Sequence, residues 1–172
     1  MGIAGGPEKC RHVREELGFD DCVDHSSPDC AAELARACPK GIDVYFEGVG
    51  GRVFEAVLPL FNTFARVPIC GAIALNDPAA PPPTLTVAAL MRTMIVKRLT
   101  IQGFLYRDLA SIEQRALSDL TQWIEDGRNK CREMVFEGFA RAPEGLIRLL
   151  RGENFGKMVV HVAEPSAGRA EA

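Results

Sequence analysis

The sequence predicts an α/β fold with a doubly wound, mostly parallel sheet. Strand-length apolar runs alternate with helix-length amphipathic segments over most of the chain, and glycines and prolines separate them. Such alternation favours a parallel sheet covered by helices on both faces. The chain has 172 residues, 47% of them hydrophobic and 25% charged, which is enough for one domain with a sizeable core.

The expected elements follow one another in a regular order. A strand ends at 2–4, and Pro7 suits the first position of the next helix. After a short strand at 22–24, Ser26 or Ser27 is expected to cap a helix over 28–38. The remaining expected segments are a β-rich run at 41–49, helices at 53–60, 84–97, 111–125 and 143–150, strands at 66–73, 99–105, 131–139 and 157–162, and a proline-rich loop at 78–83.

Composition and charge exclude several classes of function. The net charge of -3 provides no positive field that would attract nucleic acid. No apolar run approaches the roughly 20 residues that cross a bilayer, and the N-terminus lacks the pattern of a secretory signal, so no membrane partner and a cytoplasmic location are expected. None of the six cysteines forms a C-x-x-C pair, so we expect reduced thiols and no metal site.

One expected motif is missing. A dinucleotide-binding unit begins with a strand, a G-x-G-x-x-G turn and a helix whose N-terminus holds the pyrophosphate. No such turn precedes a helix here, and the glycine-rich run at 48–51 lacks the spacing. The chain is therefore expected to begin at the second strand, as a Rossmann-like sheet truncated at its N-terminus.

The end of that strand bears on cofactor choice. In enzymes that use NAD, an acidic residue at this point binds the ribose 2′-hydroxyl. Here the strand is followed by Gly5 and Gly6, which leave space for a 2′-phosphate, and Lys9 and Arg11 could neutralise it. The alternative is that both cations are simply solvated helix residues.

Six segments together resemble a known family. Their order is the same as in the prostaglandin reductase, leukotriene B4 12-hydroxydehydrogenase and curcumin reductase group, which are medium-chain dehydrogenases/reductases without zinc. The likeness runs from residue 1 to about 162. The segments are GIAGGPEKC at 2–10, EELGFD at 15–20, PKGIDVYF at 39–46, VGG at 49–51, CGAI at 70–73 and GENFGK at 152–157.

The resemblance implies an NADPH-dependent enzyme that reduces the carbon–carbon double bond of α,β-unsaturated carbonyl compounds. It implies that Lys9 binds the 2′-phosphate, that 70–76 forms a loop near the nicotinamide, and that Asn154 contacts the cofactor. His25 stands where relatives carry a tyrosine, and it could reach a phosphate or ribose. The cofactor-binding residues implied are Lys9, His25, Cys70, Gly71, Ala72, Ile73, Phe104, Leu105, Tyr106 and Asn154, and no catalytic residue can be named.

The sequence also departs from the family. Relatives carry an Asp-Asn-Val-Gly-Gly run where this chain has 47–51 without the asparagine, and Ala74 follows the CGAI segment where relatives have serine and then tyrosine. The family's N-terminal catalytic domain, first strand and glycine-rich turn have no counterpart here.

These observations suggest three parts. Residues 1–130 would be a partial Rossmann dinucleotide-binding domain, 131–162 would return to the missing catalytic domain, and 163–172 would be a disordered tail. The parent enzyme would act on a small-molecule enone, and the chain alone is expected to be inactive. The alternatives are a non-catalytic module that dimerises through the strand at 99–105, in keeping with an expected homodimer, and a flavodoxin-like domain, which the turn at 5–7 fits poorly.

Overall fold

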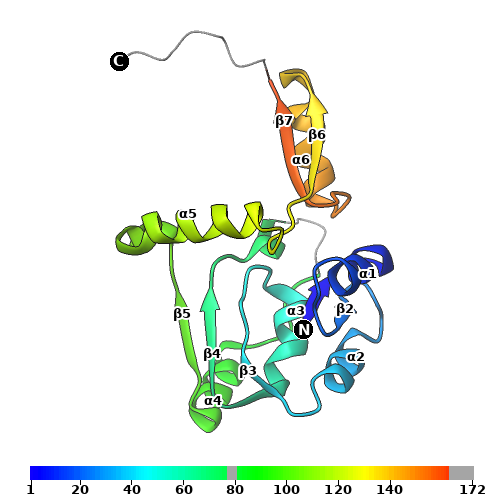
Figure 1. The fold of residues 1–172 in the computed structure, drawn as a ribbon. Coiled ribbons are helices and arrows are strands. Elements are labelled where there is room, and N and C mark those ends of the chain that lie inside the picture. The colour runs from blue at the N-terminus through cyan, green and yellow to red at the C-terminus, as the bar shows by residue number, and fades with distance from the viewer. Residues whose placement is uncertain (77–80, 163–172) are drawn as a thin grey trace. The chain divides into compact units, whose positions relative to one another are not determined.

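A computed structural model of the chain describes residues 1–76 and 81–162 (Figure 1). Strands and helices alternate, which confirms the predicted α/β class. The strands are β1 (Gly2–Ala4), β2 (Cys22–Asp24), β3 (Ile42–Val44), β4 (Phe61–Ile69), β5 (Thr100–Gly103), β6 (Glu133–Glu137) and β7 (Lys157–His161). The α-helices are α1 (Pro7–Glu15), α2 (Cys30–Ala37), α3 (Gly51–Val57), α4 (Val87–Lys97), α5 (Ala110–Glu125) and α6 (Ala142–Leu150).

The chain divides into two compact units, Met1–Asp119 and Leu120–Ala172. The first unit holds β1 to β5, and the second holds β6, α6 and β7. The functional boundary expected at residue 130 depends on a domain outside this chain, so it stays a prediction. The expected tail at 163–172 and part of the proline-rich loop at 78–83 lie outside the described residues.

Every strand pair in the described residues is parallel, as the alternating pattern predicts. In the first unit β1 pairs with β2, and β3, β4 and β5 form a second sheet in that order. Parallel neighbours cannot be joined by a tight hairpin, so a helix crosses over between each successive pair. In the second unit β6 pairs with β7.

Local sequence signals set several helix ends. Pro7 occupies the first turn of α1 and follows Gly6, whose φ of 85° suits glycine. The side chain of Thr86 caps α4 by accepting the backbone N–H of Ala89 at 3.1 Å. The cap expected at Ser26 or Ser27 is wrong, because α2 begins after Asp29 without a side-chain cap bond.

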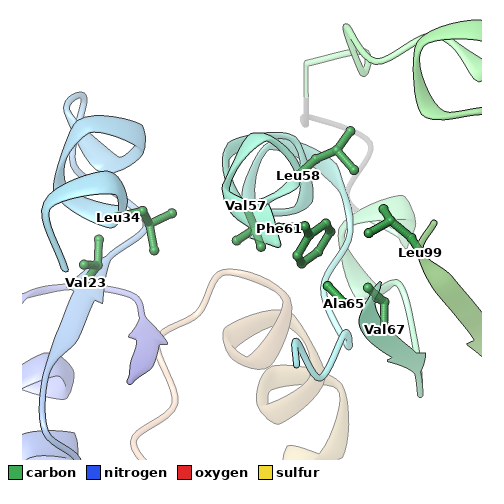
Figure 2. Packing of buried hydrophobic residues seen from close by; sticks show 8 residues of the cluster. All are labelled: Val23, Leu34, Val57, Leu58, Phe61, Ala65, Val67 and Leu99. Atoms are coloured by element: carbon green, nitrogen blue, oxygen red, sulfur yellow. The ribbon is translucent and has the colours of Figure 1, made fainter. Parts of the chain in front are cut away.

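The buried core joins the two sheets of the first unit. Val23 from β2 and Leu34 from α2 belong to the same cluster as Val57 from α3 and Phe61 and Val67 from β4, and Figure 2 shows these side chains together. Leu34, Val57 and Val67 are at most 1% exposed. Because a close-packed core resists deformation, it fixes the carboxyl ends of the strands relative to one another.

The strand expected at 66–73 is displaced, and β4 runs from Phe61 to Ile69 instead. The first part of β4 is irregular, because Phe64 has a φ of 68° and the register with β3 shifts there. The residues after Ile69 bond to a neighbouring loop rather than to a strand. The sequence pattern did not predict this bulge, because apolar alternation does not encode a positive φ at a phenylalanine.

In the second unit α6 packs on the β6–β7 pair. Phe136 of β6 is 2% exposed, and Gly145 of α6 leaves room for Met158 of β7. Gly156 has a φ of 90° where the chain turns into β7. A side chain at Gly156 would collide with the carbonyl oxygen of Arg132, so the turn needs glycine.

Candidate functional site

The loops that follow β3 and β4 are joined by backbone hydrogen bonds. Cys70 donates its N–H to the carbonyl oxygen of Glu47 at 2.8 Å, and Ala74 donates to Val49 at 2.9 Å. Gly71 lies against Gly48, where an added Cβ would meet the Gly48 oxygen at 3.4 Å. Because parallel sheets bind ligands beyond the carboxyl ends of their strands, these joined loops are a candidate site.

A buried carboxylate organises the loop after β3. Glu47 is 3% exposed, and its Oε1 accepts the N–H groups of Val49 at 2.5 Å and Gly50 at 2.8 Å. Its Oε2 has no hydrogen-bond partner among residues 1–76 and 81–162. Burial raises the pKa of the Tyr45 hydroxyl, and the nearby Glu47 carboxylate raises it further, so Tyr45 stays protonated.

The segment after β5 adds aromatic and apolar side chains to this edge. Phe104 donates its N–H to Ile69 at 3.2 Å, and its ring meets that of Phe46 edge-on with centroids 6.2 Å apart. Leu105 and Tyr106 are 67% and 70% exposed. Of the predicted site residues, the structure thus places 70–73 and 104–106 on one edge of the same sheet.

The ends of β1 and β2 form the other half of the edge. Asp24 Oδ1 accepts the N–H groups of Gly6 and Ser26, each at 2.8 Å. The bond from Gly6 lowers the pKa of the Asp24 carboxyl, so it is ionised at neutral pH. The imidazole of His25 lies over Gly5, where its Nε2 is 2.9 Å from the position of an added Cβ. Lys9 is half-buried in the first turn of α1.

A pocket of about 280 Å³ lies between the β2–α2 loop and α3. His25 and Cys30 line one side, and Arg52 and Glu55 line the other. Glu55 is held by Thr84, whose N–H and hydroxyl both donate to it at 2.6 and 2.7 Å. The bond from the Leu85 N–H lowers the pKa of the Glu55 carboxyl. Arg52 is therefore a cation that the pocket offers a ligand, and the His25 imidazole beside it provides a hydrogen-bonding group.

Arg52 and Asp24 were not identified from the sequence. The position of Arg52 immediately after a double glycine was a usable signal, because such turns place the next side chain at a strand end. Asp24 gave no signal, since its role comes from a contact with Gly6, 18 residues away.

Asn154 belongs to the second unit, whereas the other predicted residues belong to the first. Its Nδ2 donates to the carbonyl oxygen of Gly156 at 2.9 Å, which stabilises the turn into β7. Its contact with a cofactor stays a prediction.

In the part of the chain that the structure describes, no three His, Cys, Asp or Glu side chains gather in a way that could hold a metal ion. All six cysteines are unpaired, and burial raises the pKa of the Cys22 thiol to about 12. None of the described helices has the length and apolar character to cross a membrane.

Comparisons with known proteins show which family the chain is similar to. Residues 1–125 match the sequence model of the family described as zinc-binding dehydrogenase. The chain is 47% identical over 165 residues to the NADPH-dependent curcumin reductase of Escherichia coli, covering 95% of this chain and 48% of that protein. It is 35% identical to mouse prostaglandin reductase 1, over 93% of this chain and 48% of the relative.

The fold of the chain is also similar to that of a solved structure. The crystal structure of CurA from Vibrio vulnificus in complex with NADPH superposes with a TM-score of 0.89 at 44% identity, over 95% of this chain and 49% of that one. The chain thus spans about half the length of the relatives that it matches.

Proposed function

We propose that this chain, which belongs to the zinc-binding dehydrogenase family, is the cofactor-binding portion of an NADPH-dependent oxidoreductase. The proposed reaction is reduction of the carbon–carbon double bond of α,β-unsaturated carbonyl compounds without zinc, as the resemblance to the prostaglandin reductase group implies. The observation that carries the proposal is the joined carboxyl edge of parallel strands, with glycines and basic side chains where an enzyme specific for NAD would carry an acid.

The residues at this edge fit NADPH in two regions. The pocket beside His25 and Arg52, at about 280 Å³, is slightly below the roughly 300–1,000 Å³ of whole small-molecule sites, so it suits one part of a dinucleotide. Its basic side chains and the open space at Gly6 suit the adenosine end and its 2′-phosphate, with Lys9 in the adjacent helix.

The second region suits the nicotinamide. The loop at Cys70–Ile73 and the segment at Phe104–Tyr106 provide backbone groups and apolar surface, which would orient a flat ring and exclude water. NADPH, when bound, supplies the hydride. The chain's own residues would bind and orient it, and the enone substrate would be held mostly by parts of the enzyme that this chain does not span.

A second function has one observation in its favour. In the described residues β5 is the outer strand of its sheet, with a neighbour only on the β4 side. An open strand edge can pair with another copy. The chain would then act as a dimerisation module, and a cytoplasmic homodimer remains our expectation for the complete enzyme.

The test uses two small probes of the adenosine end. Calorimetric titration of the chain with adenosine 2′,5′-bisphosphate and with adenosine 5′-monophosphate should show a clear preference for the bisphosphate. Arg52→Ala should reduce that preference, whereas Arg36→Ala, an exposed change on α2, should leave it intact. Equal binding of the two nucleotides would contradict the proposed cofactor choice.

A further inference from the structure

Two buried thiols lie between α1 and the β1–β2 sheet. Cys10 of α1 is 4% exposed and Cys22 of β2 is 5% exposed. The helix packs against both strands of this sheet (Figure 1). A Cβ added at Gly2 of β1 would meet Val13 Cγ1 at 2.8 Å and Cys22 Sγ at 3.4 Å. The Cys22 side chain therefore points toward the face of the sheet that α1 covers.

Cys10 faces the same side. It precedes Val13 by three positions, and residues three apart lie on one side of a helix. Its Sγ is 3.9 Å from the carbonyl oxygen of Ala4, so it too is directed at the sheet. A side-chain hydrogen bond joins the thiols of Cys10 and Cys22. From such contact, only a small shift of the side chains brings two sulfur atoms to the disulfide bond length of about 2.05 Å.

The helix that covers the pair is held by few buried side chains. Cys10 is the one buried residue of α1. Leu17 and Phe19, which follow the helix, are 39% and 45% exposed. Segments with few buried apolar contacts open locally at a low cost in free energy. Opening of α1 admits a small oxidant to both thiols, and closing returns the two sulfur atoms to contact.

We propose that Cys10 and Cys22 form a redox-sensitive modification site, at which a hydroperoxide produces a disulfide that fastens α1 to β2. In the first step one sulfur attacks a peroxide oxygen, so that an S–O bond forms, the O–O bond breaks, and water or an alcohol leaves. In the second step the other sulfur displaces the hydroxyl group, which departs as water with the remaining thiol proton. The two thiols together lose two electrons, and the peroxide gains them.

The order of the two steps follows from the state of Cys22. Burial and, to a smaller extent, the hydrogen bond with Cys10 raise the pKa of the Cys22 thiol to about 12. Cys22 therefore keeps its proton at neutral pH, whereas the nucleophile in thiol chemistry is the thiolate. Cys10 is thus the sulfur that attacks the peroxide, and Cys22 is the sulfur that completes the disulfide.

The disulfide changes the behaviour of α1. A covalent link between the helix and β2 limits the separations that local opening can reach. The helix carries Lys9, and Asp24 holds the N–H of Gly6 just before it at 2.8 Å. Oxidation therefore keeps this strand end in its closed geometry. The inference goes beyond cofactor binding and requires no nucleotide.

The principal experiment treats the purified chain with hydrogen peroxide, alkylates the remaining thiols and maps the peptides by mass spectrometry. We expect peptides linked through Cys10 and Cys22, which dithiothreitol separates. Cys10→Ala should abolish this link. The matched control is Cys38→Ala, at the half-buried cysteine that ends α2, and it should leave the link intact. Links spread among all the cysteines, or oxidation confined to the exposed Cys70 and Cys131, would overturn the proposal.

A second measurement uses the wild-type chain alone, so it does not depend on how a variant folds. Hydrogen exchange is compared between the peroxide-treated chain and the reduced chain. The amides of α1 should exchange at least about tenfold more slowly after oxidation, because the cross-link restricts opening of the helix. The amides of α3 should exchange at the same rate in both forms. Equal rates for α1 in the two forms would also overturn the proposal, since the disulfide would then not fasten the helix.

Discussion

At the scale of single residues, two carboxylates hold the backbone of the candidate site in place. Glu47 gathers the N–H groups of Val49 and Gly50 after β3, and Asp24 holds the N–H of Gly6 after β1. Neither side chain needs to touch a ligand for this purpose. They are positioning residues, since they fix loops whose glycines leave room for a cofactor.

Removing the Glu47 carboxylate should destabilise the first unit. Glu47→Ala leaves the part-buried N–H groups of Val49 and Gly50 without their acceptor, and a hydrogen bond to a charged group contributes about 1.5–3 kcal/mol. Urea denaturation should therefore show a lower free energy of unfolding. Glu47→Gln retains an acceptor oxygen, so its free energy of unfolding should fall much less. An unchanged midpoint in Glu47→Ala would show that the loop does not depend on this side chain.

Asp24 should contribute a pH-dependent stability. Its pKa is lowered in the folded state from the ordinary 3.8, so its contribution is fully present above that value and is lost as pH falls through the folded pKa. The side chain of Asp24→Asn cannot titrate. Below pH 4 the urea midpoint of this variant should therefore fall less steeply with decreasing pH than that of the wild type. Asp29→Asn, at an exposed aspartate, is the control. Parallel curves for wild type and Asp24→Asn would contradict the prediction.

Lys9 is the residue on which cofactor choice is expected to depend. In the complete enzyme, Lys9→Ala should weaken the binding of NADPH by about 10- to 100-fold, because charged hydrogen bonds contribute about 1.5–3 kcal/mol. The affinity for NADH should change little. Binding constants from fluorescence titration provide the measurement. Lys40→Ala, before β3 at the opposite ends of the strands, should affect neither cofactor. An equal loss for NADPH and NADH would show that Lys9 does not bind the 2′-phosphate.

At the scale of elements, sequence patterns predicted most strands and helices. Pro7 and the apolar stripe of α5 were sufficient signals, because capping and periodicity are local properties. The start of β4 was missed, since apolar alternation does not encode the positive φ of Phe64. The proximity of Arg52 to His25 depends on the packing of α3 against the β2–α2 loop, which local patterns do not encode.

The turn before β7 allows a test of the two units. Gly156→Ala places a side chain against the Arg132 carbonyl at a φ of 90°, so the β6–β7 pair should be destabilised by more than about 1 kcal/mol. The backbone amides of β6 and β7 should lose protection from hydrogen exchange, while those of β4 should stay protected. The control is Gly152→Ala, where φ is 68° but no atom lies within 4 Å of the added carbon. Uniform loss of protection across both units would contradict a local effect of this substitution.

At the scale of the whole molecule, the first unit contains one edge of the proposed cofactor site and two separate parallel sheets, β1–β2 and β3–β4–β5. The 172 residues contain no G-x-G-x-x-G turn that precedes a helix. What the sequence did not reveal is that the two sheets share a core, because that depends on contacts between Leu34 and residues far along the chain. The shared core is why the strand ends still meet at one edge.

This organisation leads to a prediction about activity. The purified chain should not turn over a simple enone with NADPH, because it spans about half of its relatives and substrate contacts would come mainly from the other half. Catalysis needs the reacting atoms to be held in line, and a bound cofactor without a substrate cleft cannot do so. The absorbance of NADPH should stay constant when the purified chain and the enone are both present. Turnover by the chain alone would show that its own carboxyl edge binds the substrate as well as the cofactor.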